Sequence, residues 1–400
     1  MLSILINAYA CSPIKGSEPG MAWNWIINLA QDCKLYVITE GEWEKEIEDY
    51  LEQHQLKDRI QFYYNPVSEE VQTMCWNQGD WRFYYHYRKW QKSTLNIAQE
   101  IIKKEKVDII HQLNMVGYRE PGLLWKINGI PKVWGPIGGF GGVPNNYLAL
   151  YGKKEALKQS IKQFINMWQV QLPYIKKPIQ QVNAIVACNS AAKEVLSAIV
   201  KRDIPIISEV GAKLFEDTLI QKDYSAKTLK VIWVGKNDER KALSIAIEVF
   251  KQLSDYNIEL HVYGIDKKEI ASIECSENVT FHGWLAHAEV QDALNNAHLL
   301  LFTSLFEATG TAVLEAISMG LPVLCHKTCG QGDIINDTCG FTVEMLGIAH
   351  SIQVFKEKII ELHNNRKLLK KLSEGAFDRV EEVSWQSNSS KMLEIYKSLV

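Results

Sequence analysis

Two glutamates eight residues apart, Glu307 and Glu315, stand where carboxylates can bind parts of a ligand. Between them Gly310 separates an apolar run from a stretch with helical periodicity. Carboxylates repel phosphate, but they accept hydrogen bonds from hydroxyl groups. A phosphate instead suits the free N–H groups and the positive dipole at the start of a helix. The pattern therefore predicts a ligand that carries both a phosphate and sugar or ribose hydroxyls.

The spacing of the two glutamates argues against a glycosidase pair. A continuous helix rises about 1.5 Å per residue, so this offset would separate them by roughly 12 Å. We therefore expect Glu307 and Glu315 to contact different parts of one extended ligand. The alternative is structural, with one glutamate capping a helix and the other exposed on its surface.

The elements around the glutamates form a strand–helix–strand unit. Residues 298–304 are a short apolar run typical of a buried strand, residues 311–320 have helical spacing, and residues 321–325 predict a second strand. Such a unit belongs to a parallel sheet. The N–H groups predicted to face a phosphate are those of Gly310, Thr311 and Ala312.

A basic turn opens the same half of the chain. The stretch from Lys230, KVIWVGKNDERKAL, predicts a strand, a turn with Lys236, Arg240 and Lys241, and a helix that ends near Leu253. Cations at the start of a helix oppose its dipole and cost stability unless an anion is present. That local cost indicates a functional turn. The alternative is a solvated charged turn.

The first half of the chain opens with a similar turn. Residues 2–9 predict a strand, and the loop CSPIKGSEPG that follows leads into a helix. The loop lacks the dinucleotide-binding pattern G-x-G-x-x-G, but Lys15, Gly16 and Ser17 form a looser turn able to approach a phosphate. An ordinary glycine turn is the alternative.

Further strands are predicted at residues 34–39, 59–65, 107–111, 131–135 and 184–188, mostly with helical patterns between them. This alternation is the signature of a doubly wound sheet. His111 is predicted to close the fourth strand, at the edge where open α/β sheets bind ligands. A structural histidine is the alternative. Gly138 and Gly139 follow the fifth strand and are expected in the wall of the cleft.

Two stretches of the first half combine aromatic and basic residues. Residues 74–92 contain Trp76, Trp81 and Trp90, and residues 151–181 hold six lysines against one glutamate. If these side chains share one exposed face, they suit a membrane interface. The alternative is a large helix packed on the sheet, with its lysine head groups extended into solvent.

The stretch FEATGTAVLEAISMGLPVLC resembles the Glu-x7-Glu signature of the retaining glycosyltransferases of family 4, which belong to glycosyltransferases group 1. The resemblance implies that Glu307 contacts the donor sugar and Glu315 the nucleotide ribose. The basic turn resembles the element that clamps the donor diphosphate, which implies Lys236 and Lys241 in that role. Lys236 stands where the family has arginine, so bidentate geometry is lost and Arg240 is a candidate substitute.

The resemblance extends to smaller elements. HGW at residues 282–284 resembles the element beside the nucleobase, and GSEPG resembles the loop that touches the donor phosphate. The expected catalytic residues are Glu307, Lys241 and Lys236. The expected donor-binding residues are Glu315, Arg240, Gly235, Gly16, Ser17, Gly264, Gly283, Trp284, Ala308, Thr309, Gly310, Thr311 and Ala312. The expected acceptor-side residues are His111, Gly138 and Gly139, and no metal ligand is expected.

The implied fold is α/β, with two Rossmann-like domains that face each other across a cleft, the GT-B fold. We expect an acceptor-side domain at residues 1–205, a nucleotide-sugar-binding domain at 206–383, and a last helix at 384–400 that returns to the first domain. The implied activity moves a sugar, with retention and without metal, from a UDP- or GDP-sugar to a glycan, lipid-linked or small-molecule acceptor. A non-catalytic sugar-nucleotide-binding partner and a nucleotide-sugar epimerase are the alternatives.

Composition narrows the partners and the location. The chain has 400 residues, of which 46% are hydrophobic and 23% charged, and its net charge is −3. This charge gives no attraction to nucleic acid. The first residues lack a basic segment and a signal-length apolar run, and no run approaches the length of a membrane span. We expect a cytoplasmic protein, with a peripheral contact to the inner face of the membrane through its first domain, in cell-surface polysaccharide or glycoconjugate synthesis.

Overall fold

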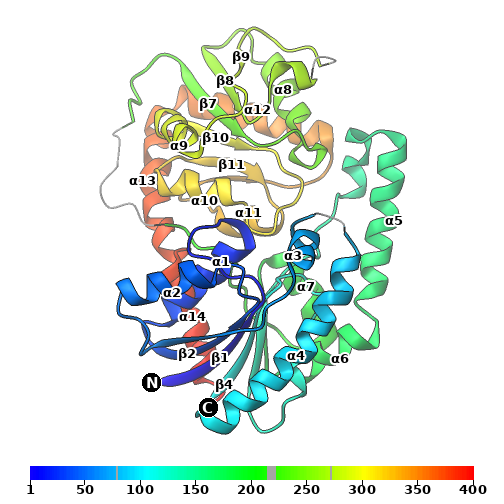
Figure 1. Ribbon diagram of the computed structural model, residues 1–400. Coiled ribbons are helices and arrows are strands. Elements are labelled where there is room, and N and C mark those ends of the chain that lie inside the picture. The colour runs from blue at the N-terminus through cyan, green and yellow to red at the C-terminus, as the bar shows by residue number, and fades with distance from the viewer. Residues whose placement is uncertain (78–79, 214–221, 271–272) are drawn as a thin grey trace.

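The chain folds around two parallel six-stranded sheets, one above the other in Figure 1. The computed structural model describes residues 1–77, 80–213, 222–270 and 273–400. The first sheet has the strand order β3-β2-β1-β4-β5-β6 and the second the order β12-β11-β10-β7-β8-β9. The predicted α/β class, with two Rossmann-like sheets in a GT-B arrangement, is confirmed.

The first sheet contains β1 (Leu2–Ala8), β2 (Cys33–Thr39), β3 (Ile60–Tyr64), β4 (Ile109–Asn114), β5 (Lys132–Ile137) and β6 (Ala184–Ala187). The helices around it are α1 (Ser17–Leu29), α2 (Glu44–Gln53), α3 (Glu69–Trp76), α4 (Arg82–Lys104), η1 (Leu124–Lys126), η2 (Asn145–Leu150), α5 (Lys153–Gln169), α6 (Pro173–Gln181) and α7 (Ser190–Val200).

The second sheet contains β7 (Leu229–Val234), β8 (Ile258–Tyr263), β9 (Val279–Phe281), β10 (Leu299–Phe302), β11 (Val323–His326) and β12 (Gly340–Val343). Its helices are η3 (Glu239–Lys241), α8 (Leu243–Lys251), η4 (Lys267–Ile270), α9 (His287–Asn296), α10 (Thr311–Ser318), α11 (Cys329–Ile334), α12 (Ile348–Asn364) and α13 (Arg366–Glu382), and α14 (Trp385–Lys397) ends the chain.

The central strands are apolar on both faces because helices cover both sides of each sheet. In β1, Ile4 and Ile6 pack into the core that α1 and α14 cover, whereas Leu5 points into the core under α4. Alternate residues of a strand point to opposite faces, so burial on both sides requires a nearly continuous apolar run. This is why the strands stand out in the sequence.

The last helix returns to the first domain, as predicted. The rings of Trp385 in α14 and Trp25 in α1 meet edge to face, with centroids 6.1 Å apart. The two chain crossings between the domains run side by side, because the Ala212 N–H donates to the Val383 carbonyl at 2.8 Å. Figure 1 shows α13 descending along the second domain and α14 continuing beside the first.

A further contact joins the domains on the other side. Residues 143–151, which follow β5, extend into the core of the second domain through Val143, Tyr147 and Tyr151. The Tyr147 hydroxyl and the Ser351 hydroxyl are 2.6 Å apart, and His326 Nε2 lies 2.8 Å from the same serine oxygen. These buried hydrogen bonds hold residues 143–151 against the second domain.

The aromatic stretch divides between core and surface. Trp76 and Trp81 are 44% and 77% exposed, but Trp90 is 3% exposed and its ring lies 4.9 Å from that of Tyr9. The condition for a membrane interface here, that the three tryptophans share an exposed face, is therefore not met by Trp90, which lies on the inner side of α4. No helix in the described ranges combines the length and the apolar character that crossing a bilayer requires.

Candidate functional site

The turn between β10 and α10 places Glu307 at the carboxyl edge of the second sheet. Gly310 precedes α10 with φ of 80°, a left-handed conformation that glycine adopts without strain. The first N–H groups of α10, at Thr311 and Ala312, have no partner within the helix. They lie on the same turn as Glu307.

Two cations hold the carboxylate of Glu307. Its Oε1 is 2.5 Å from Nζ of Lys241, and its Oε2 is 2.5 Å from Nη1 of Arg240. All three side chains are largely buried, with 14% of Glu307, 18% of Lys241 and 28% of Arg240 exposed. Arg240 also pairs with Asp238, whose Oδ2 is 3.3 Å from Nη2, so two carboxylates accompany the two cations. An incoming anion would share Arg240 and Lys241 with these carboxylates.

The backbone of the basic turn fixes these cations. Asp238 caps η3 by accepting a hydrogen bond from the Arg240 N–H at 2.8 Å, and Arg240 Nη1 donates to the Phe306 carbonyl at 3.0 Å. Burial alone would lower the pKa of Arg240, but the charge of Glu307 raises it above its ordinary value. The guanidinium is therefore a permanent charge. Lys236, by contrast, is exposed, and its side chain extends from the turn into solvent.

Glu315 lies on α10, half-buried, where burial raises the pKa of its carboxyl group and the nearby His287 and Lys213 partly offset that rise. The helix covers only Thr311–Ser318, so the roughly 12 Å separation from Glu307, which assumed about 1.5 Å per residue of continuous helix, does not apply. Glu307 belongs to the turn and Glu315 to the second turn of the helix.

Three of the predicted glycines cluster at the carboxyl ends of adjacent strands. Gly235, Gly264 and Gly283 follow β7, β8 and β9, and the Gly264 N–H donates to the Gly283 carbonyl at 2.7 Å. Gly264 and Gly283 have φ of 90° and 70°. A side chain at Gly264 would meet the Gly235 carbonyl oxygen at 2.3 Å. Trp284 follows them and is 78% exposed, so its ring is free to stack on a ligand.

The first domain contributes two glycine turns. Gly16 and Ser17 start α1 in exposed positions, and the added Cβ of a side chain at Gly16 would meet no atom within 4 Å. Gly138 and Gly139 follow β5, where the Gly138 N–H donates to the Val116 carbonyl at 2.9 Å. A side chain at Gly138 would meet the Cys188 sulfur at 2.9 Å, so this turn lacks room for one.

His111 does not lie at the edge of the sheet. β4 continues three residues beyond it to Asn114, so the expected strand end is corrected and His111 lies within the strand. It is fully buried, with Nε2 2.6 Å from the Gly135 carbonyl and Nδ1 2.5 Å from the Tyr396 hydroxyl of α14. Burial lowers the pKa of His111 to about 4, so the ring is neutral. This placement fits the structural alternative and gives no contact to an acceptor.

Residues that the sequence analysis missed connect the domains beside Glu307. Asn189 Nδ2 donates to the Ala308 carbonyl at 2.9 Å, and the hydroxyls of Ser208 and Thr309 are 3.1 Å apart. Asn189 follows β6 and caps α7, a pattern that could have indicated it from the sequence. Ser208 stands in the connection between the domains and carries no such signal.

Two half-buried carboxylates lie in the same region. Burial raises the pKa of Glu209 to about 7, the nearby Glu18 adds to this rise, and a hydrogen bond with Thr309 opposes it. Glu18 accepts a hydrogen bond from the Val116 N–H at 2.7 Å. Glu209 was passed over because it stands in no recognisable motif, and Glu18 because only the glycine and the serine of GSEPG were assigned a role.

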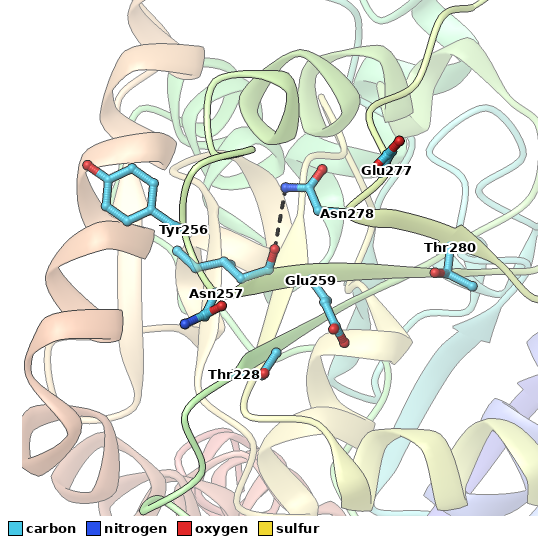
Figure 2. A pocket seen from close by; sticks show the side chains of 8 residues that line it. Thr228, Tyr256, Asn257, Glu259, Glu277, Asn278 and Thr280 are labelled. Atoms are coloured by element: carbon cyan, nitrogen blue, oxygen red, sulfur yellow. Dashed lines mark hydrogen bonds between the residues drawn. The ribbon is translucent and has the colours of Figure 1, made fainter.

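A hollow of about 260 Å³ lies elsewhere in the second domain (Figure 2). It is lined by Thr228, Asn257 and Asn278, which precede β7, β8 and β9, together with the carboxylates of Glu259 and Glu277. It is therefore at the amino edge of the sheet, opposite the glycine cluster. Among the described residues, no group of three or more His, Cys, Asp or Glu side chains is placed to hold a metal ion.

Comparison with known proteins agrees with this geometry. Residues 216–379 match the family model described as glycosyl transferases group 1. The chain is 32% identical over 120 residues to the lipopolysaccharide glucosyltransferase WaaG of Escherichia coli. The matched stretch covers 28% of this chain and 32% of that protein. The curated relatives are matched over about a quarter to a half of their own length.

Solved structures match the whole chain in fold. A glycosyltransferase from Rickettsia africae has a TM-score of 0.63 at 17% identity, with 100% of this chain and 98% of that one covered. HepE from Anabaena, in complex with UDP and glucose, has a TM-score of 0.57 at 13% identity, with both chains covered in full. At these identities the likeness establishes the fold.

Proposed function

Because residues 216–379 match the family model of the glycosyl transferases of group 1, we propose that the chain belongs to this family and transfers a sugar from a nucleoside-diphosphate sugar. The observation that carries the proposal is the pairing of Glu307 with Lys241 and Arg240 beside the start of α10. It brings together two largely buried cations, the N–H groups at a helix start and the carboxylate of Glu307. The donor has matching parts: a diphosphate and a sugar with hydroxyl groups.

The proposed chemistry depends on the leaving group. As the bond between the anomeric carbon and the diphosphate breaks, negative charge grows on the phosphate oxygen. Lys241, Arg240 and the N–H groups of Thr311 and Ala312 stabilise that charge, and prearranged groups of this kind do so without reorganisation. Lys236, which extends from the same turn, supplies a further cation when donor is bound. These groups support the proposal that transfer needs no metal ion.

We assign the remaining donor contacts by position. Glu307 accepts hydrogen bonds from the donor sugar and Glu315 from the ribose, since carboxylates pair with hydroxyl groups. The glycine cluster of Gly235, Gly264 and Gly283, together with Trp284, binds the base. We favour UDP or GDP as the nucleotide, and HepE supports UDP because that protein of similar fold is described in complex with UDP and glucose.

The stereochemistry proposed is retention, as in family 4. The acceptor oxygen attacks the anomeric carbon from the side that the diphosphate leaves, and the departing phosphate oxygen takes the acceptor proton. The acceptor enters from the first domain, past Gly138 and Gly139, whereas Gly16 and Ser17 approach the donor phosphate. We propose a glycan, lipid-linked or small-molecule acceptor in cell-surface polysaccharide or glycoconjugate synthesis, at the inner face of the membrane.

The test is turnover of UDP- and GDP-sugars by the purified protein, with nucleoside diphosphate and sugar products followed by mass spectrometry. The proposal predicts slow release of nucleoside diphosphate from one donor in the absence of acceptor, and faster release when acceptor is added. Conversion of the donor into an epimer would favour the epimerase. Tight binding without turnover, with and without acceptor extracts, would favour a non-catalytic partner.

A further inference from the structure

The helix α5 turns its apolar side to solvent and its polar side to the protein. No residue of α5 is buried. Its large apolar side chains point outward, with exposed fractions of 63% at Leu157, 50% at Ile161, 72% at Phe164, 42% at Ile165, 73% at Met167 and 60% at Trp168. A helix on a globular protein normally has the opposite orientation. In Figure 1, α5 stands at the side of the molecule.

The orientation of α5 is fixed by hydrogen bonds on its polar side. Arg119 donates through Nη2 to Asn166 Oδ1 at 2.6 Å and through Nε to Gln169 Oε1 at 3.1 Å. The Tyr118 hydroxyl donates to the Asn166 carbonyl at 3.1 Å, and Gln163 donates to the Val143 carbonyl. Rotating the helix to bury its apolar side would break these bonds. The apolar surface is thus built into the fold.

The charges around this surface are almost all positive. The helix α5 itself contains four lysines and one glutamate, a sum of +3 in a chain whose net charge is −3. The glutamate, Glu155, accepts a hydrogen bond from Gln159 at 2.8 Å and pairs with Lys158 at 3.3 Å, so it offsets the charge of one lysine. Lys154, Lys158 and Lys162 lie along one border of the apolar strip, at the spacing of a helical face. The surface is therefore complementary to a partner that is apolar at its centre and anionic at its border.

We propose that α5 lies in the headgroup region of an anionic lipid bilayer, with its apolar strip turned into the hydrocarbon. An anionic bilayer has phosphate groups at the level of the lysines and acyl chains beneath them. A basic amphipathic helix lies in this interface with its apolar side about 5–10 Å deep. The 17 residues of α5 give a contact line of about 25 Å at about 1.5 Å per residue.

The position of α5 relates this surface to the active site. The Gln163 side chain lies against Gly142, and a side chain at Gly141 would meet the Phe306 ring at 3.1 Å. Phe306 is the neighbour of Glu307. A bilayer on α5 would therefore lie next to the cleft and present a lipid-linked acceptor to it. This choice of acceptor rests on the proposed glycosyl transfer, whereas membrane binding by α5 does not.

Vesicle flotation without any nucleotide tests the proposal. The wild-type protein should float with vesicles of phosphatidylcholine plus phosphatidylglycerol, more as the anionic lipid increases and less as salt rises. The double variant F164E/W168E should lose flotation. The triple variant K154Q/K158Q/K162Q should bind about 100-fold more weakly, since each lysine near an anionic surface contributes about fivefold. The control L346E changes a side chain that is 71% exposed on the second domain and should float like the wild type.

Failure of the wild type to float at low salt would overturn the proposal, as would undiminished flotation of F164E/W168E. Light scattering covers the remaining alternative. If the wild type does not float but forms a dimer, and F164E/W168E abolishes that dimer, the face binds a second copy of the chain. The shift in Tm with UDP or GDP, measured without lipid, should be the same in every variant. That readout separates a failure of membrane binding from a failure of the proposed nucleotide-sugar chemistry.

Discussion

Lys241→Ala removes one of the two cations that hold Glu307. The lysine Nζ is 2.5 Å from Glu307 Oε1 and lies 5.2 Å from the centre of the Phe302 ring. In the proposed reaction its charge faces the diphosphate as that group leaves. We therefore expect the loss to fall on the transition state more than on ground-state donor binding.

Loss of one preorganised group of an oxyanion-type site costs about 2–4 kcal/mol of transition-state stabilisation. At about 1.4 kcal/mol per tenfold change, kcat should fall by about 30- to 700-fold. Stability should change less, because Arg240 still pairs with Glu307 at 2.5 Å. A partly buried charge left with fewer partners costs about 1–3 kcal/mol of unfolding free energy, so Tm must be measured beside the rate.

The assay is release of nucleoside diphosphate under donor saturation, at a temperature well below the Tm of both proteins. Lys370→Ala is the matched control, because its ion pair with Glu374 is 3.8 Å long and both side chains are more than 60% exposed. Such a surface pair contributes about 0–1 kcal/mol, so the control should retain the wild-type rate. An unchanged kcat in Lys241→Ala would remove Lys241 from the reaction and refute the reasoning.

Three further predictions follow from the same site. Glu315→Gln should raise KM for the donor and leave kcat nearly unchanged, because a ribose contact is made in ground and transition states alike; steady-state kinetics in which only kcat falls would contradict the ribose assignment. Treatment with EDTA should leave transfer intact, since Lys241, Arg240 and the start of α10 supply the positive charge, and loss of activity restored by magnesium or manganese would show that carboxylate ligands were overlooked. The pKa of Glu209 is raised from 4.5 to about 7 by burial, so the folded state binds this proton more tightly than the unfolded state and the contribution of Glu209 to stability is lost as pH rises from about 4.5 to about 7. The Tm should fall less steeply across that pH window for Glu209→Gln than for the wild type, and equal slopes of Tm against pH would exclude Glu209 as a cause of the decline.

Much of the second domain could be predicted because its signals are local. The apolar run before Glu307, the break at Gly310 and the helical spacing after it specify β10, the turn and α10 without reference to the rest of the chain. Lys241 and Arg240 could also be identified from a local signal, because cations at the start of a helix cost stability unless an anion is present. Their contact with Glu307 joins positions more than 60 residues apart, which spacing alone does not reveal.

The residues that the sequence analysis placed wrongly are positioned by contacts with residues distant in the sequence. His111 was expected at a strand end, but β4 extends to Asn114 and Tyr396 of the last helix covers the ring. Trp90 was grouped with exposed tryptophans, although it follows the buried side of α4 with Phe83 and Tyr87. The basic composition of residues 151–181 was visible in the sequence. The outward orientation of the apolar side of α5 could not be predicted, because it depends on hydrogen bonds from Arg119, which is distant in sequence.

The most direct test of the central claim is a thermal-shift titration of UDP and GDP against the wild type and Lys241→Ala. Ligand at 100 times its Kd should stabilise the folded wild-type protein by about 2.7 kcal/mol, which is a clear rise in Tm. We predict this rise for one of the two nucleotides, with a smaller rise at the same concentration for Lys241→Ala. No shift with either nucleotide at millimolar concentration, or equal shifts in both proteins, would contradict a diphosphate site at Glu307, Arg240 and Lys241.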